Sequence, residues 1–296
     1  MNDNDYILVT KDLCKSYGKS QVLKNLNIKV PKGSIYGFIG KNGAGKTTLI
    51  RLVTGLQYPS SGEIIMNCDR RKIGAIVETP ALHLNLSASD NLNLQMDILG
   101  LGHEKTDELL DFVGLSETQN KHVANFSLGM RQRLAIAVAL CGEPEFLVLD
   151  EPINGLDPQG IIDVRNLITE INRIKGITIL ISSHILEELS KVATHYGFID
   201  NGRIIAEMSA EKLKKISEKS MLLTLSKINN TDEAMKKFNN RYEFNDDSKL
   251  RIYGEINVTQ LILALNEQNI EVLNIVSKEE NLEEYFFGLL GGDYNE

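Results

Sequence analysis

The stretch Gly40-Lys41-Asn42-Gly43-Ala44-Gly45-Lys46-Thr47 decides the fold of this chain. It matches the pattern GxxxxGK[ST] at every fixed position. The apolar run SIYGFIG (residues 34–40) precedes it, and apolar side chains at helical spacing follow it, namely Leu49, Leu52, Val53 and Leu56. This order of strand, glycine loop and helix is the context that the pattern requires. The sequence therefore predicts a phosphate-binding loop that opens a helix in an α/β domain.

The residues of this loop predict how a nucleotide is held. Glycines let consecutive backbone N–H groups point at a β-phosphate, and the N-terminus of the helix adds partial positive charge. Lys46 is expected to reach the β- and γ-phosphates, and the Thr47 hydroxyl is a candidate ligand of Mg²⁺. Thr48 is expected to contact the α-phosphate. The predicted nucleotide-binding residues here are Gly40, Lys41, Asn42, Gly43, Ala44, Gly45, Lys46, Thr47 and Thr48.

Composition excludes several classes of protein. The chain has 296 residues with 32 Lys or Arg and 40 Asp or Glu, and a net charge of -8 argues against a protein that wraps nucleic acid. Three widely spaced cysteines (Cys14, Cys68 and Cys141) predict free thiols in a reducing compartment. Residues 1–10 lack the features of a signal peptide, and runs such as residues 134–140 are too short to span a bilayer. We therefore expect a cytoplasmic chain that reaches a membrane only through another protein.

The strand and helix patterns predict an α/β architecture. Continuous apolar runs at residues 145–150 and 177–182 flank a helical pattern at residues 161–176, which is typical of a mostly parallel sheet. Residues 5–10 and 22–30 predict an antiparallel sheet at the front, and residues 195–207 predict a hairpin around Asn201-Gly202. A largely helical insertion over residues 85–141 separates the two strand regions.

A second, smaller unit is expected after residue 215, where the composition turns polar. Its segments predict the order strand, helix, strand, strand, helix, strand, as in a ferredoxin-like α+β domain over residues 216–296. A final helix over residues 281–290 is expected to dock through Tyr285, Phe286 and Leu289.

Two carboxylates follow the apolar strand FLVL (residues 146–149). Asp150 and Glu151 do not belong in a core, so we expect them at the carboxyl edge of the sheet, where ligands bind in α/β proteins. Asp150 is a candidate ligand of Mg²⁺, directly or through water. Glu151 is a candidate catalytic residue that polarises the water attacking a γ-phosphate. The alternative interpretation is that Asp150 and Glu151 are an ordinary acidic pair at the end of a strand, with no role in catalysis. The phosphate loop upstream argues against it.

Residues 125–133 (NFSLGMRQR) resemble the signature segment of ABC-type ATPases. Ser127 is a good N-cap, and the helix that follows would aim its positive end at an anion. By itself this stretch is an ordinary capped helix. In the ABC family, the serine and glycine corresponding to Ser127 and Gly129 bind the γ-phosphate held by the opposite subunit. The resemblance therefore implies a head-to-tail dimer, expected to be a homodimer, with ATP between its subunits.

Other family positions follow in order along residues 5–215. Tyr17 resembles the aromatic residue that stacks on adenine, Asp157 lies in a loop like the one that contacts the partner subunit, and His184 resembles the switch histidine that contacts the γ-phosphate. The resemblance implies an ABC ATPase domain over residues 1–215, with a RecA-like core, an antiparallel β subdomain and a helical subdomain at about residues 79–141. It also implies separate transmembrane permease subunits, so the chain would be peripheral on the inner face of the cell membrane.

Two departures from the family pattern narrow the function. The signature has Leu128 and Met130 in place of the usual glycine and glutamine. Glu78 stands where the family has a glutamine that ligates Mg²⁺ at the hinge to the helical subdomain. These features resemble the ATPases of bacitracin-resistance and lantibiotic self-immunity exporters, which implies an ATP-hydrolysing subunit that drives export of an antimicrobial peptide. We interpret Glu78 as a candidate metal ligand that tunes coupling to the permease.

Three alternatives stay open on the residues alone. The chain could serve another drug exporter, or it could be a non-transport ABC ATPase that acts on ribosomes or DNA. Ribosomal members usually carry two cassettes and DNA-repair members insert coiled coils or zinc motifs, and neither feature is present in this sequence. A P-loop kinase or GTPase would have no reason to keep Ser127 and His184 in these positions.

Overall fold

The computed structural model describes residues 3–118, 120–216, 219–246, 248–278 and 288. The chain divides into two compact units, Met1–Ala210 and Glu211–Glu296. This boundary falls after the first residue of helix α7 (Ala210–Ile216), whereas the sequence predicted it near the end of that helix, after residue 215. No helix among the described residues is both long and apolar enough to cross a membrane.

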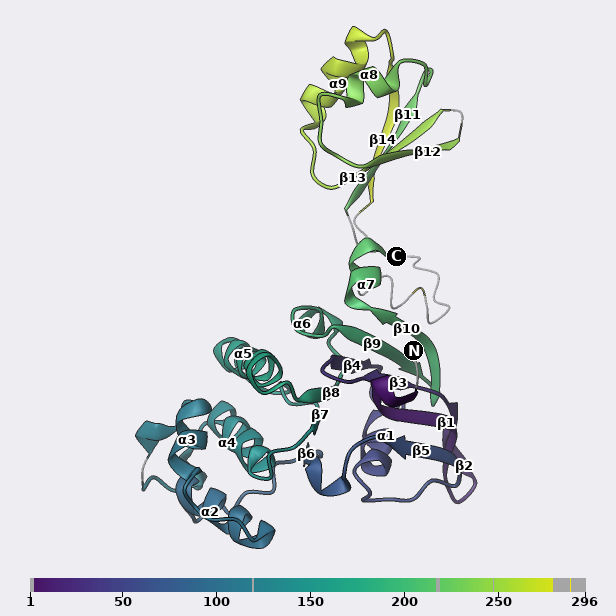
Figure 1. Ribbon diagram of the computed structural model, residues 1–296. Helices are drawn as coiled ribbons and strands as arrows, with labels where there is room; N and C mark the ends of the chain where they lie inside the picture. Colours follow the sequence, from purple (N-terminus) through teal and green to yellow (C-terminus); the bar gives the residue numbers. More distant parts are fainter. Residues whose placement is uncertain (1–2, 119, 217–218, 247, 279–287, 289–296) are drawn as a thin grey trace. The chain divides into compact units, whose positions relative to one another are not determined.

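A six-stranded sheet forms the centre of the first unit (Figure 1). All neighbouring strands are parallel except the antiparallel hairpin at one edge, so the predicted mostly parallel α/β sheet is confirmed. In spatial order the strands are β10 (Arg203–Ser209), β9 (His195–Asp200), β4 (Ile35–Ile39), β8 (Thr178–Ser183), β7 (Phe146–Asp150) and β6 (Ile73–Ile76).

The register of the central strands determines where polar residues meet. Every residue of β4, β7 and β8 is buried, because helices cover both faces of a parallel sheet. Ile39 lies opposite Ser183, and Asp150 lies opposite Ser182. The three carboxyl ends therefore meet at one edge of the sheet, and the chain leaves each strand there into a polar segment.

A smaller antiparallel sheet contains β1 (Tyr6–Tyr17), β2 (Ser20–Leu26), β3 (Lys29–Pro31) and β5 (Ser61–Met66), preceded by the short 3-10 helix η1 (Asp3–Asp5). The strand pattern of residues 22–30 is broken into β2 and β3. Asn25 has a left-handed backbone with φ 49°, and the Asn27 side chain accepts a hydrogen bond from the Asp12 N–H at 2.8 Å. The strand is interrupted at these two asparagines, and β2 and β3 both pair antiparallel with successive parts of β1.

The helical subdomain comprises α2 (Ala88–Leu99), α3 (Thr106–Phe112) and α4 (Leu128–Leu140), with short 3-10 turns η3 (Ser116–Thr118) and η4 (Val123–Asn125). Figure 1 shows these three helices gathered together. Ser87 begins α2 with a capping box, accepting from the Asp90 N–H, which is one of the two caps that the sequence allowed. The remaining helices of this unit are α1 (Lys46–Val53), η2 (Arg70–Lys72), α5 (Pro158–Lys175) and α6 (Leu186–Ser190).

The second unit has its own sheet and core. Its four strands pair antiparallel in the order β12, β13, β11, β14, and α8 and α9 share one core with them. The chain order is β11 (Ser220–Leu225), α8 (Thr231–Met235), β12 (Tyr242–Asp246), β13 (Lys249–Tyr253), α9 (Val258–Glu267) and β14 (Val272–Lys278). The helix expected over residues 281–290 lies outside the described residues except for residue 288.

Candidate functional site

The phosphate loop joins β4 to α1 through a path that glycine makes possible. A Cβ on Gly40 would lie 2.5 Å from the carbonyl oxygen of Ile199, so a larger residue cannot fit without moving the backbone of β9. Gly45 has φ +114°, a conformation that side chains disfavour, and α1 begins at the next residue. The loop is thus held against β9 and delivers Lys46 to the first turn of the helix.

Lys46 is the centre of a small polar cluster. Its side chain is only 5% exposed, and a buried ammonium needs partners. Its Nζ donates to the carbonyl oxygens of Gly40 at 2.7 Å and Lys41 at 3.3 Å. The same nitrogen lies 3.1 Å from Oε1 of Glu151. The structure therefore brings the predicted phosphate-binding lysine and the predicted catalytic glutamate into direct contact.

Glu151 is oriented from both its backbone and its side chain. Its φ of 49° is left-handed, which turns the chain sharply at the end of β7. Its N–H donates to the Ser182 hydroxyl at 2.9 Å, and its Oε2 lies 2.8 Å from Nδ1 of His184. His184 follows β8 directly, so the pairing of β7 with β8 places these two side chains together. Lys46 and His184 thus contact the two carboxylate oxygens of Glu151 at the carboxyl edge of the sheet.

Asp150 offers a buried carboxylate at the same edge. It is 3% exposed, and within the described part of the chain only the Ser182 hydroxyl donates to it, at 2.5 Å. Thr47, the second residue of α1, carries a hydroxyl next to Lys46 in the chain. Both groups are oxygen donors, which Mg²⁺ prefers. Among the described residues no three His, Cys, Asp or Glu side chains are grouped so that they could hold a metal ion.

Ser182 is a site residue that the sequence analysis missed. It is fully buried, and its single hydroxyl contacts both Asp150 and the backbone of Glu151. A polar residue at the carboxyl end of the apolar strand TILIS was the available signal. That signal was weak, because a serine in a strand carries no chemistry until its neighbour strand is known.

Tyr17 lies at the end of β1, partly exposed, away from any core. Its hydroxyl donates to Oε1 of Gln57, and Nζ of Lys15 lies 5.2 Å from the ring centroid. The ring is thus held in place by a hydrogen bond at its tip and a cation beside it. Gln57, which follows α1, is a second residue that the sequence gave no reason to select.

The signature residues lie in a second cluster, where two helices begin. Ser127 caps α4 by accepting from the Met130 N–H at 3.2 Å, and Asp157 caps α5 by accepting from the Gly160 N–H at 3.0 Å. A Cβ on Gly129 would lie 3.7 Å from Cα of Gly160, so the two N-termini are neighbours. Ser127 is exposed, and the first N–H groups of any helix lack partners within the helix and carry partial positive charge. This cluster can receive an anion from another molecule.

Glu78 lies in the loop after β6 with a left-handed backbone, φ 62°. Its carboxylate forms an ion pair with the guanidinium of Arg51, on the last turn of α1. The sequence predicted a tentative Mg²⁺ contact for Glu78 and did not select Arg51. In this structure the carboxylate is therefore directed at a cation of the phosphate-loop helix.

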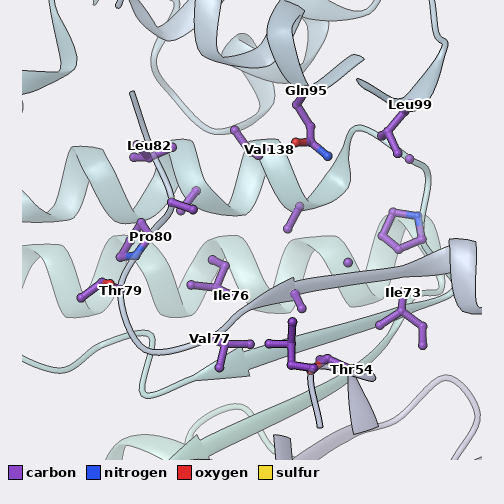
Figure 2. Close-up of a pocket in the computed structure, with 18 of the residues that line it drawn as sticks. Thr54, Ile73, Ile76, Val77, Thr79, Pro80, Leu82, Gln95, Leu99 and Val138 are labelled. Atoms are coloured by element: carbon purple, nitrogen blue, oxygen red, sulfur yellow. The ribbon is translucent and has the colours of Figure 1, made fainter. Parts of the chain in front are cut away.

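A groove of about 450 Å³ is lined by residues of the helical subdomain and of the edge strand β6. Figure 2 shows Val77, Thr79 and Pro80 along its sheet side, with Gln95 and Leu99 from α2 opposite. Thr54 and Leu56, which follow α1, also line it, and Leu56 is 64% exposed. The groove is mostly apolar, and the residues on both sides of Glu78 belong to its wall.

Comparison with known proteins identifies the family. Residues 23–154 match the family model described as ABC transporter. The chain is 42% identical to the bacitracin transport ATP-binding protein BcrA of Bacillus licheniformis, over 97% of this chain and 98% of that protein. It is 45% identical to the lantibiotic transport ATP-binding protein SrtF of Streptococcus pyogenes, over 72% of this chain and 95% of that protein.

Solved structures agree with this family. CbiO1 of Clostridium perfringens, part of the ABC transporter complex cbiONQ, superposes with a TM-score of 0.65 at 28% identity, covering 72% of this chain and 95% of that one. The ADP conformation of MJ1267, an ATP-binding cassette of an ABC transporter, gives a TM-score of 0.66 at 28% identity, covering 72% and 94%. With the phosphate loop, the carboxylate pair and the signature cluster in place, the chain belongs to the ATP-binding subunits of ABC transporters, a family of ATPases.

Proposed function

We propose that this chain is the ATP-hydrolysing subunit of an exporter that carries an antimicrobial peptide out of the cell, as part of resistance or self-immunity. The observation that carries the proposal is the likeness to a bacitracin transport ATPase across both structural units, 97% of the chain. The likeness to a lantibiotic transport ATPase supports the same substrate class over the first unit. The permease, which would contact the peptide in the membrane, decides which peptide is exported.

The polar cluster at the sheet edge supports the hydrolysis step. Lys46 binds the β- and γ-phosphates of ATP, with the N–H groups of the phosphate loop around them. Glu151 orients a water molecule in line with the γ-phosphate and accepts its proton. His184, 2.8 Å from Glu151, holds that carboxylate and contacts the γ-phosphate. Tyr17 stacks on the adenine.

The donor set at the sheet edge also fits Mg²⁺. Asp150 and Thr47 would hold the ion, and Mg²⁺ when bound neutralises charge that develops on the β- and γ-phosphate oxygens. Ser182 keeps the Asp150 carboxylate in place for that role through its 2.5 Å hydrogen bond. Glu78 is a further candidate ligand if its bond to Arg51 is exchanged for the ion.

A second ATPase subunit completes the site in this proposal. Ser127 and Gly129 begin α4, a 13-residue helix whose N-terminus carries partial positive charge. They would bind the γ-phosphate held by the partner. Asp157 caps the neighbouring helix α5 beside them. Two identical chains would thus enclose two ATP molecules, and closure would follow ATP binding.

The groove beside the helical subdomain supports a permease partner. Its apolar lining suits the apolar face of a short amphipathic helix. A cytoplasmic helix of a separate transmembrane subunit would dock there, so that the chain lies on the inner face of the membrane. A ribosomal or DNA partner finds no support in a net charge of -8.

Capture from membranes tests the proposal. Tagged Glu151→Gln protein, which holds ATP without hydrolysing it, is incubated with solubilised membranes and Mg-ATP. Recovery of a multi-span permease supports export, and deletion of that permease should sensitise cells to one class of peptide. Glu143→Gln, on an exposed residue, serves as a control that keeps hydrolysis and should recover less permease. Recovery of ribosomes or DNA in place of a permease would overturn the transport assignment.

A further inference from the structure

We infer that Arg51 is a positioning residue, and that its ion pair with Glu78 carries nucleotide binding from the phosphate loop to the wall of the groove. The inference rests on the proposed function for what occupies the groove, a permease helix. The link itself is built from residues of this chain alone, so it can be tested without the permease.

The first step of the link is a rigid helix. Lys46 and Arg51 stand on the same helix, α1, five residues and about 7.5 Å of axial rise apart. Between and beyond them Leu49, Ile50 and Val53 are buried in the main core cluster of the first unit. Because the core holds this helix on several sides, a movement at Lys46 is carried to Arg51 as movement of one body.

The second step is the ion pair itself. The Arg51 guanidinium contacts the Glu78 carboxylate across 27 residues of chain, and both side chains retain access to solvent, at 33% and 54%. An exposed pair of this kind contributes little to folding stability. It is therefore suited to break and re-form as its partners move, and its loss should leave the fold intact.

The third step is the groove wall. Val77 and Thr79, on either side of Glu78, both line the groove (Figure 2). The Glu78 side chain instead contacts Arg51 of α1. The left-handed backbone at Glu78 lets its side chain point toward α1 while its two neighbours line the groove. Thr54, the residue after α1, lines the same wall. Arg51 and Glu78 thus join two segments that a docked helix would touch together.

This route differs from one through the metal. If Glu78 acted only as a ligand of Mg²⁺, Arg51 would be dispensable, because the carboxylate would still be present in Arg51→Gln. If the ion pair carries the signal, Arg51→Gln removes it although Glu78 is untouched. The charge-reversed double variant, Arg51→Glu with Glu78→Arg, restores a pair but leaves no carboxylate at position 78 for a metal.

Hydrogen–deuterium exchange on the purified full chain separates these routes. A non-hydrolysable ATP analogue with Mg²⁺ is expected to slow exchange over residues 41–48 in every variant. Over residues 77–82 the analogue should change the deuterium exchange rate by about threefold or more in the unaltered protein and in the double variant. In Arg51→Gln the change should be less than about 1.5-fold. Lys105→Gln, which breaks another exposed ion pair of the same unit, should behave as the unaltered protein.

Two outcomes would overturn the inference. One is an Arg51→Gln protein whose residues 77–82 respond to nucleotide as fully as those of the unaltered chain. The other is a double variant that protects residues 41–48 but does not respond at residues 77–82. Melting temperatures within about 3 °C of the unaltered protein in all variants ensure that a lost response is not a lost fold. Failure to capture a permease would be a separate result, against the proposed transport function only.

Discussion

The hydroxyl of Ser182 donates a hydrogen bond of 2.5 Å to Oδ1 of Asp150. The Ser182 hydroxyl oxygen also accepts the N–H of Glu151 at 2.9 Å, so one buried serine on β8 positions both carboxylate residues at the end of β7. The arrangement depends on the register in which Asp150 lies opposite Ser182. Positioning of this kind matters because even a small displacement of a reacting group lowers the reaction rate.

Ser182→Ala should therefore lower both stability and activity. Loss of the hydroxyl removes one acceptor of the Glu151 N–H and the donor to the Asp150 carboxylate. We therefore expect the free energy of unfolding to fall by about 1–3 kcal/mol. The ATPase kcat should fall by roughly tenfold or more, with a smaller change in KM. Denaturant unfolding and steady-state hydrolysis measure the two effects. Ser190→Ala, whose hydroxyl only donates to the Glu187 carbonyl, should change neither appreciably.

Gly40→Ala should damage nucleotide binding through a steric contact. The added Cβ would lie 2.5 Å from the Ile199 carbonyl oxygen, and backbone of β9 cannot yield as a side chain can. We expect ATP affinity to fall by about tenfold or more and stability by about 1–3 kcal/mol. Fluorescent nucleotide titration measures the first. The matched control is Gly142→Ala, where the new Cβ meets atoms at ordinary distances of 3.6 and 3.9 Å; an equal loss there would contradict the steric explanation.

Ser127→Ala and Ser87→Ala compare two helix caps of different function. Each removes a side chain that accepts an N–H at its helix start, so each should cost about 1 kcal/mol and lower the Tm by about 2–4 °C. Only Ser127→Ala should also weaken ATP-dependent dimer formation, because only that serine lies in the signature segment. Light scattering with Glu151→Gln as background measures the dimer. Equal dimerisation in both variants would remove Ser127 from the partner's site.

Stability should depend on pH through His195. Burial lowers the pKa of this histidine from its ordinary value of 6.5, so the folded protein binds the proton less readily than the unfolded chain. The stabilising effect is complete above about pH 6.5 and is lost as the pH falls through the folded pKa. His195→Gln should lose less stability than the unaltered protein between about pH 7.5 and 5.5 in urea unfolding. His122→Gln, on an exposed residue, should follow the unaltered curve; parallel curves for all three proteins would contradict the prediction.

The second unit should unfold independently of the first, because it has a core of its own. Leu261 of α9 is fully buried among residues of that unit, and Leu261→Ala should cost about 2–5 kcal/mol there. Calorimetry should show one transition moved to lower temperature while hydrolysis at moderate temperature is retained. A concerted shift of all transitions would instead mean that the two units unfold together.

Much of the fold was predictable because it follows from local patterns. Continuous apolar runs predicted the buried strands, and their alternation with helices predicted the parallel sheet that the structure confirms. Helix starts were partly predictable as well, since Ser87 and Ser127 are good caps. The break between β2 and β3 was not, because it depends on the left-handed Asn25 and on a hydrogen bond from a distant residue, Asp12.

The sequence by itself determined the phosphate loop, the carboxylate pair and the signature segment, since each is a run of adjacent residues whose chemistry is local. Tertiary structure alone decided which side chains those residues contact. Ser182 beside Asp150, Gln57 beside Tyr17 and Arg51 beside Glu78 are pairs separated by 32, 40 and 27 residues of chain. No local pattern encodes such pairs, because strand register and helix packing, which depend on the whole core, bring them together.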